Sequence, residues 1–351
     1  MDLLDRYKLL NASYTKVLVY HLGIDTGFFT EYTRMIEAML FCLEHKIQFR
    51  LYSDYANFGY TPAGGWTDYF RPFCLEMHEP FHRKYNLYPM PSWKIIWSEV
   101  IKKKDIRLAA WKIKSSFRHF IGSLCAFFVY KKRVLLTHNI HLYHNSSHLF
   151  DIPELGLCCD YLHAFRVLSE MVWQMNDETK QQCAKLRSSI FLPLEYVGCQ
   201  VRGGDKITEV SLVSPSLYVK YIRQYTRSRD VFVLTDDYRL FLQLQSLAPD
   251  IHWYTLCSSG EKGYVNSDFT HVKEDGKRSQ MLRFLTSVGI LIQSSLFIGS
   301  ITTAPSFYLL KVLYPSNALP IDCLRDDIPC VALLSLKERV AISQSYLKRN
   351  L

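Results

Sequence analysis

The sequence predicts an α/β fold with two domains, each built on a parallel sheet. Its 351 residues are enough for about two domains with ample cores. Hydrophobic residues make up 48% of the chain and aromatic residues 14%, which is typical of a globular protein. Short apolar runs alternate with helical patterns in both halves of the chain, and this order of elements favours parallel sheets.

The first domain begins with a strand, a glycine-containing turn, a helix and a second strand. Residues 16–20 and 48–52 form the apolar runs, and residues 31–45 show the spacing of an amphipathic helix. Strands of such a βαβ unit are parallel, and their ligands usually lie beyond the carboxyl ends. Gly23 and Gly27 follow the first strand, so we predict that they line a ligand site. A purely structural tight turn is the alternative.

A second α/β domain begins near residue 196. Its expected strands cover residues 197–201, 230–237, 252–256 and 296–299. Its expected helices cover residues 214–226, 238–247 and 279–292, and a further helix opens within 300–306 and ends near 313. We place the domains at residues 1–188 and 189–322, followed by a helical tail at 323–351.

The net charge of +9 fits an anionic partner such as a nucleotide or a phospholipid surface, although solubility alone would also account for it. We expect no nucleic-acid partner. The basic residues are scattered, and neither a zinc-finger pattern nor an aromatic RNA-binding signature is present.

Cysteine usage and the apolar stretches suggest a cytoplasmic protein. The chain has ten cysteines but no CxxC pair, which indicates reduced thiols. The acidic N-terminal residues do not resemble a signal peptide. Residues 120–130 are apolar but too few to span a bilayer, which takes about 20 residues. Because Lys131, Lys132 and Arg133 follow, this stretch is either a peripheral membrane contact or a buried helix.

The strongest candidate site follows the strand at residues 197–201. Arg202, two glycines, Lys206 and Glu209 come directly after this apolar run. Glycines let the backbone approach an anion, and the cations neutralise its charge, so the pattern is typical of a phosphate site. A surface loop in which Arg202 and Lys206 pair with Asp205 and Glu209 is the alternative.

Two further strand ends carry polar residues. Asp236 and Asp237 follow the strand that starts at residue 230, and Ser300, Thr302 and Thr303 follow the strand at 296–299. Carboxyl ends of parallel strands meet at one edge of a sheet, so we expect these groups to lie near Arg202. Structural alternatives are helix capping by Asp237 and by the threonines.

Four histidines gather at positions 138, 141, 144 and 148, a spacing that could ligate a metal. No cysteine or carboxylate pattern frames them, and we predict no metal site. The chain also lacks an Asp-x-Asp pair, the motif with which many nucleotide-sugar enzymes hold a divalent ion.

In order and spacing these motifs resemble the α1,6-fucosyltransferase family between about residues 16 and 315, except for a poorly matching stretch between about residues 76 and 188. The matching segments are Gln200–Val201–Arg202 with Asp205, Lys206 and Glu209, then Thr235–Asp236–Asp237, Thr302–Thr303, Gly23 with Gly27, Gly64–Gly65–Trp66 and Phe70–Arg71–Pro72. The chain departs from the family at Gln200, where the family has His, and near Ser287, where the family has a carboxylate that binds guanine.

The resemblance implies a GT-B-like fold, with two Rossmann-type domains whose parallel sheets face an interdomain cleft. It also implies inverting, metal-independent transfer of L-fucose from GDP-fucose to a hydroxyl of a glycan acceptor bound by the first domain. Glu209 would be the general base, Arg202 would offset charge on the leaving diphosphate, and Lys206 would tune Glu209 or contact phosphate. The implied nucleotide-sugar contacts are Gln200, Arg202, Asp236, Asp237, Ser300, Thr302, Thr303, Gly23 and Gly27. Two alternatives are another nucleotide sugar and a catalytically silent binding module.

Overall fold

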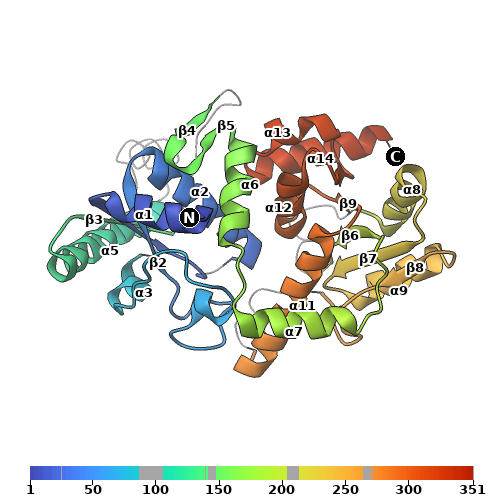
Figure 1. Ribbon diagram of the computed structural model, residues 1–351, viewed down its shortest axis with the longest axis horizontal. Coiled ribbons are helices and arrows are strands. Elements are labelled where there is room, and N and C mark those ends of the chain that lie inside the picture. Colours follow the sequence, from blue (N-terminus) through green and yellow to red (C-terminus); the bar gives the residue numbers. More distant parts are fainter. Residues whose placement is uncertain are drawn as a thin grey trace. The chain divides into compact units, whose positions relative to one another are not determined.

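The computed structural model describes residues 1–24, 26–86, 106–138, 140, 148–203, 213–263, 269 and 272–350. The chain forms two compact units (Figure 1). Unit 1 comprises Met1–Tyr143, Leu149–Cys159 and Val167–Gln174, and unit 2 comprises the remainder. The domain boundaries at residues 188 and 322 stay predictions.

The sheet of unit 1 has three parallel strands in the order β2–β1–β3. Strand β1 (Lys16–His21) pairs on one side with β2 (Ile47–Tyr52) and on the other with β3 (Val134–Thr137). All residues of β1 after Lys16 are buried, as expected of a central strand covered on both faces. Helix α2 (Phe28–Glu44) connects β1 to β2, so the predicted βαβ unit is confirmed.

The other elements of unit 1 are short, apart from one long helix. They are α1 (Leu3–Ser13), η1 (Gly65–Asp68), α3 (Phe81–Tyr85), α5 (Ile106–Tyr130), β4 (Phe150–Ile152), η2 (Pro153–Leu155) and β5 (Leu157–Cys159). Trp66 is fully buried, and its ring stacks on Tyr32 and Phe70. The Gly–Gly–Trp segment therefore anchors the aromatic core of this unit.

Unit 2 contains a five-stranded parallel sheet in the order β10–β9–β6–β7–β8. Its strands are β6 (Val197–Val201), β7 (Asp230–Thr235), β8 (His252–Tyr254), β9 (Leu296–Gly299) and β10 (Ala318–Pro320). Because all pairs are parallel, the carboxyl ends of these strands lie at one edge. The sequence did not indicate β10.

The helices of unit 2 include the C-terminal helix, which therefore belongs to the same compact unit as this sheet. They are α7 (Asp177–Ser188), α8 (Pro215–Tyr225), α9 (Tyr238–Leu247), α11 (Glu274–Ile292), α12 (Ala304–Leu313), η4 (Arg325–Asp327), α13 (Ile328–Val331) and α14 (Leu336–Asn350), while α6 (Tyr161–Val172) has residues in both units. The hydroxyl of Tyr346 on α14 lies 3.1 Å from that of Tyr221 on α8.

Two further observations bear on the sequence analysis. All ten cysteines are free thiols. Within the described residues, no helix combines the length and the apolarity needed to cross a bilayer.

Candidate functional site

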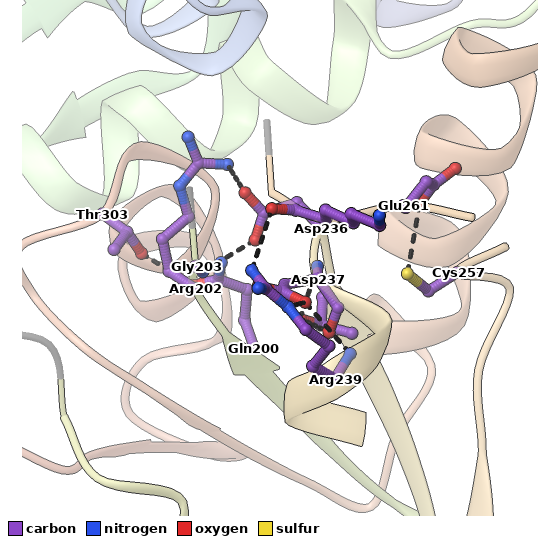
Figure 2. A network of polar contacts seen from close by, with 11 residues as sticks. Gln200, Arg202, Gly203, Asp236, Asp237, Arg239, Cys257, Glu261 and Thr303 are labelled. Atoms are coloured by element: carbon purple, nitrogen blue, oxygen red, sulfur yellow. Dashed lines mark hydrogen bonds and ion pairs between the residues drawn. The ribbon is translucent and has the colours of Figure 1, made fainter. Parts of the chain in front are cut away.

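The carboxyl end of β6 carries an arginine that is held in place by the neighbouring strand. Arg202 Nη1 lies 2.7 Å from Asp236 Oδ2, and both side chains are only 16% exposed. The other carboxylate oxygen of Asp236 accepts a hydrogen bond of 2.8 Å from the amide of Gly203 (Figure 2). Asp236 thus fixes both the guanidinium and the first residue of the following loop.

Gly203 is required at this position for steric reasons. A Cβ atom built on Gly203 would lie 2.8 Å from the Cβ atom of Asp237, closer than real Cβ contacts. The loop that follows, residues 204–212, lies outside the described residues. The predictions for Asp205, Lys206 and Glu209 fall in this segment and stay predictions.

Asp237 caps the helix that follows β7. It is the N-cap of α9, where its Oδ1 accepts a hydrogen bond of 3.0 Å from the amide of Arg239. The guanidinium of Arg239 donates to both carboxylate oxygens, at 2.9 and 2.6 Å, and these bonds lower the pKa of Asp237. This geometry supports the capping alternative considered for Asp237 from the sequence.

The carboxyl end of β9 is held by hydrogen bonds to a residue that the sequence did not indicate, Asp322. Asp322, which follows β10, is fully buried and accepts hydrogen bonds from the hydroxyl of Ser300 (2.6 Å), the amide of Ile301 (3.0 Å) and the hydroxyl of Ser343 (2.8 Å). Burial raises the pKa of Asp322. Thr302 Oγ1 lies 2.7 Å from Ser300 Oγ, so both hydroxyls take part in this internal network.

Gln200 connects β6 to the start of α12. The hydroxyl of Thr303 donates to Gln200 Oε1 at 2.6 Å, and both residues are buried. Thr303 is the N-cap of α12, but its side chain makes no capping hydrogen bond because the hydroxyl points to Gln200. Gln200 and Arg202 therefore join β6 to its two neighbours in the sheet, β9 and β7.

Taken together, the three strand ends place a guanidinium, a backbone amide and a helix N-terminus at one edge of the sheet of unit 2. A helix N-terminus carries partial positive charge and attracts anions. Asp236 partly offsets the positive charge of Arg202. The arrangement can bind an anionic group, which would either contact Arg202 alongside Asp236 or take the place of Asp236 as its partner.

In unit 1, the turn that contains Gly23 is already filled by a side chain. The carboxylate of Glu31, on α2, accepts hydrogen bonds from the amides of Gly23, Ile24 and Thr26. Gly23 has φ = +82°, and a Cβ atom there would approach Ala56 Cβ to 2.3 Å. Gly27 is the N-cap of α2. These contacts support the tight-turn alternative, since Glu31 is placed where an anion would have to bind.

A second polar cluster lies beside the site, near Ser287, one of the two positions at which the sequence departs from the family pattern. The hydroxyl of Ser287 donates to the carbonyl of Arg283 within α11, at 2.8 Å. Arg283 also donates to Glu261, which accepts a hydrogen bond from Cys257 Sγ at 3.1 Å (Figure 2). Burial is the main cause that raises the pKa of the Cys257 thiol. Glu261 lies in a loop without periodicity, so no pattern of residues indicated it.

The histidine group is only partly described. His141 and His144 lie outside the described residues, and His138 Nδ1 is 3.2 Å from the carbonyl oxygen of Asn86. In the described part of the chain, no three His, Cys, Asp or Glu side chains are grouped as metal ligands.

Comparisons with known proteins bear on the fold. No protein-family model matches the sequence, and no curated protein is similar to it in sequence. The crystal structure of fucosyltransferase NodZ from Bradyrhizobium is similar, with 13% sequence identity, a TM-score of 0.50, and coverage of 85% of this chain and 93% of that chain. A GDP complex of a mutant of Arabidopsis thaliana FUT1 has 12% identity, a TM-score of 0.48 and coverage of 88% and 72%. Apo POFUT1 has 12% identity, a TM-score of 0.44 and coverage of 87% and 97%.

The likeness to NodZ shows that this chain has a GT-B-like α/β fold with parallel sheets. The predicted fold class is therefore confirmed, and the family resemblance inferred from the motifs is confirmed at the level of the fold.

Proposed function

We propose that the protein is a glycosyltransferase that moves L-fucose from GDP-fucose to a hydroxyl of a glycan acceptor, with inversion and without a metal. The observation that carries this proposal is the pairing of Arg202 with Asp236 at the carboxyl end of β6, beside the Gly203 amide. The fold, which is that of a protein described as a fucosyltransferase, supports it. A cytoplasmic location and contact with a membrane surface also remain proposals.

In the proposed reaction, an acceptor hydroxyl attacks the anomeric carbon of fucose from the face opposite the diphosphate. The new C–O bond forms as the bond between fucose and the β-phosphate breaks, and the hydroxyl proton passes to Glu209. Negative charge gathers on the departing GDP. Arg202 and the N-terminus of α12 stabilise that charge, which is the role a divalent ion has in other enzymes.

The three strand ends contribute in different ways to this chemistry. Arg202 contacts phosphate, and Asp236 is a positioning residue that sets the direction of its guanidinium. Thr303, Gln200 and Ser300 hold the edge of the sheet in shape through buried hydrogen bonds. Pre-organised charge of this kind is effective because it needs no rearrangement during the reaction.

The first test is a GDP-release assay with GDP-fucose and mixed glycan acceptors. The proposal expects turnover that persists in the presence of a chelator. Binding of GDP without turnover under any acceptor would instead support a catalytically silent nucleotide-binding module. The buried Gln200–Thr303 hydrogen bond, where the family has His, is the observation in favour of that second function.

The nucleotide base is open to a separate test, because the hydroxyl of Ser287 is used within α11. We expect GDP to raise the melting temperature more than UDP or ADP. A ligand present at about 100 times its Kd stabilises the folded state by about 2.7 kcal/mol. A larger shift with UDP or ADP would indicate that the donor is another nucleotide sugar and not GDP-fucose.

A further inference from the structure

Helix α5 exposes an unusual row of large apolar side chains. The row, which we call the α5 stripe, consists of Ile113, Phe117, Phe120, Leu124, Phe127 and Phe128. Each of these side chains is 41–65% exposed. At 3.6 residues per turn they fall within an arc of about 100° on one side of the helix.

On the opposite side of α5, the residues that are buried against the rest of unit 1 are small. Ser115, Gly122 and Ala126 are buried there, and Ala126 is fully inaccessible. A Cβ atom on Gly122 would approach Tyr85 Cβ of α3 to 2.7 Å, so the helix packs closely through this face. Figure 1 shows α5 beside α3 and β3. The core of unit 1 therefore does not use the α5 stripe.

This distribution corrects one of the alternatives drawn from the sequence. Residues 120–130 do not form a buried helix, because five of their large apolar side chains are exposed. Single exposed apolar residues are common on protein surfaces, but contiguous ones mark interaction sites. Apart from Phe191, every exposed phenylalanine in the described part of the chain belongs to the α5 stripe.

Charge around α5 indicates the kind of partner. Between Lys102 and Arg133 the sequence has ten Lys or Arg residues and one acidic residue, Asp105, so this segment has a net charge of +9. The whole chain also has a net charge of +9, so positive and negative residues balance in the rest of the protein. No Asp or Glu occurs between residues 106 and 150. Lys114, Lys131 and Arg133 are exposed next to the α5 stripe.

We propose that α5 binds the surface of an anionic lipid bilayer, with the α5 stripe inserted among the lipids and the basic residues at the headgroups. Helices that lie in a membrane interface combine an aromatic and aliphatic face with Lys and Arg, and they need not span the bilayer. A second copy of the chain fits less well, because its own α5 would bring like charges together. The proposal does not depend on the enzymatic activity.

Flotation of the full-length protein with vesicles tests this proposal. We expect it to float with vesicles of phosphatidylcholine and phosphatidylglycerol, but not with phosphatidylcholine alone, and to be released by salt. The triple variant Phe117→Gln, Phe120→Gln, Phe128→Gln should reduce the partition coefficient on the order of 100-fold or more. Lys131→Glu with Arg133→Glu should reduce it at least ~25-fold, about fivefold for each lost positive charge.

Matched variants in unit 2 serve as controls. Phe191→Gln, Leu194→Gln and Leu242→Gln remove three exposed apolar side chains, and Lys180→Glu with Lys337→Glu makes the same change in net charge. Both controls should float like the unchanged protein, and circular dichroism checks that every variant is folded.

Three results would overturn the proposal. The first is failure of the unchanged protein to float with the anionic vesicles. The second is flotation that the α5 variants leave intact. The third is a protein that does not bind vesicles and sediments as a dimer, with the phenylalanine variant sedimenting as a monomer. That result would show that α5 forms a contact between two copies of the chain.

Discussion

Replacing Asp236 by Asn separates the charge of this residue from its shape. The amide keeps an oxygen for the Gly203 N–H, but it removes the negative partner 2.7 Å from Arg202. Hydrogen bonds to charged groups contribute about 1.5–3 kcal/mol to stability. Because both side chains are 16% exposed, we expect solvent to reduce the loss to about 1–2 kcal/mol.

The kinetic effect should be larger than this loss of stability suggests. Without the charge of Asp236, the guanidinium of Arg202 loses the ion pair that orients it at the strand end, and we expect kcat to fall about 10- to 100-fold, or about 1.4–2.7 kcal/mol. Binding of GDP should be unchanged or tighter, because a negative charge has been removed from the proposed anion site. Initial-rate kinetics and titration calorimetry measure the two quantities.

Asp250→Asn is the control for this experiment. Asp250 pairs with Arg223 and Arg229 in the same unit, at 2.7 and 3.0 Å, but all three side chains are about half exposed. Exposed pairs contribute less than about 1 kcal/mol, so this variant should change neither kcat nor GDP binding. If Asp236→Asn retained full kcat with a normal affinity for GDP, Asp236 would not position Arg202 and our reasoning about the site would be wrong.

Two further predictions concern stability. Thr303→Val removes the donor to the buried Gln200 Oε1 and should lower the free energy of unfolding, measured by urea denaturation, by about 1–3 kcal/mol. Thr303→Ser keeps the hydroxyl and should retain most of the stability. Equal losses in the two variants would show that the hydrogen bond is unimportant. His21 is buried, and burial together with His82 and His138 lowers its pKa to about 3. In the unfolded chain a histidine binds a proton below about pH 6.5, whereas buried His21 stays neutral. The free energy of unfolding is therefore unaffected by His21 above that pH and falls as the pH drops toward 3, by ~2 kcal/mol at about pH 5. His21→Gln should flatten the dependence of unfolding free energy on pH between about 6.5 and 5, and an unchanged slope would contradict the assignment.

Much of the architecture could be read from the sequence because it depends on local patterns. Runs such as Val197–Val201 are apolar throughout, which is typical of a strand covered on both faces. Pro215 after Ser214 marks the start of α8, and Ser214 is its N-cap. Parallel pairing then brings the ends of β6, β7 and β9 together without knowledge of any side-chain contact.

The polar contacts of the site could not be read in this way, because they join residues far apart in the chain. The hydrogen bond between Thr303 and Gln200 depends on the registry of β6 beside β9. Asp322 could not be recognised as the partner of Ser300, since it follows β10, a strand of three residues that the sequence did not indicate. Similarly, nothing in the pattern around Gly23 shows that Glu31 turns back to bind its amide.

Helix α5 illustrates a different limit. A helical period of apolar residues indicates that one face is apolar, but not that this face is buried. In α5 the small residues on the other side, Gly122 and Ala126, make the close contact with unit 1. Which face packs inward is decided by the space available beside α3 and β3, and this is a property of the folded unit.

The central claim is that a positive charge of the protein, rather than a bound ion, stabilises the departing diphosphate. Steady-state kinetics of Arg202→Ala, with Arg223→Ala as an exposed control, test it most directly when they are run with and without chelator. We predict that kcat falls ~100-fold or more in Arg202→Ala only, and that chelator leaves the activity of the unchanged protein intact. A loss of less than about tenfold, equivalent to 1.4 kcal/mol, or activity that chelator abolishes and magnesium or manganese restores, would contradict the claim.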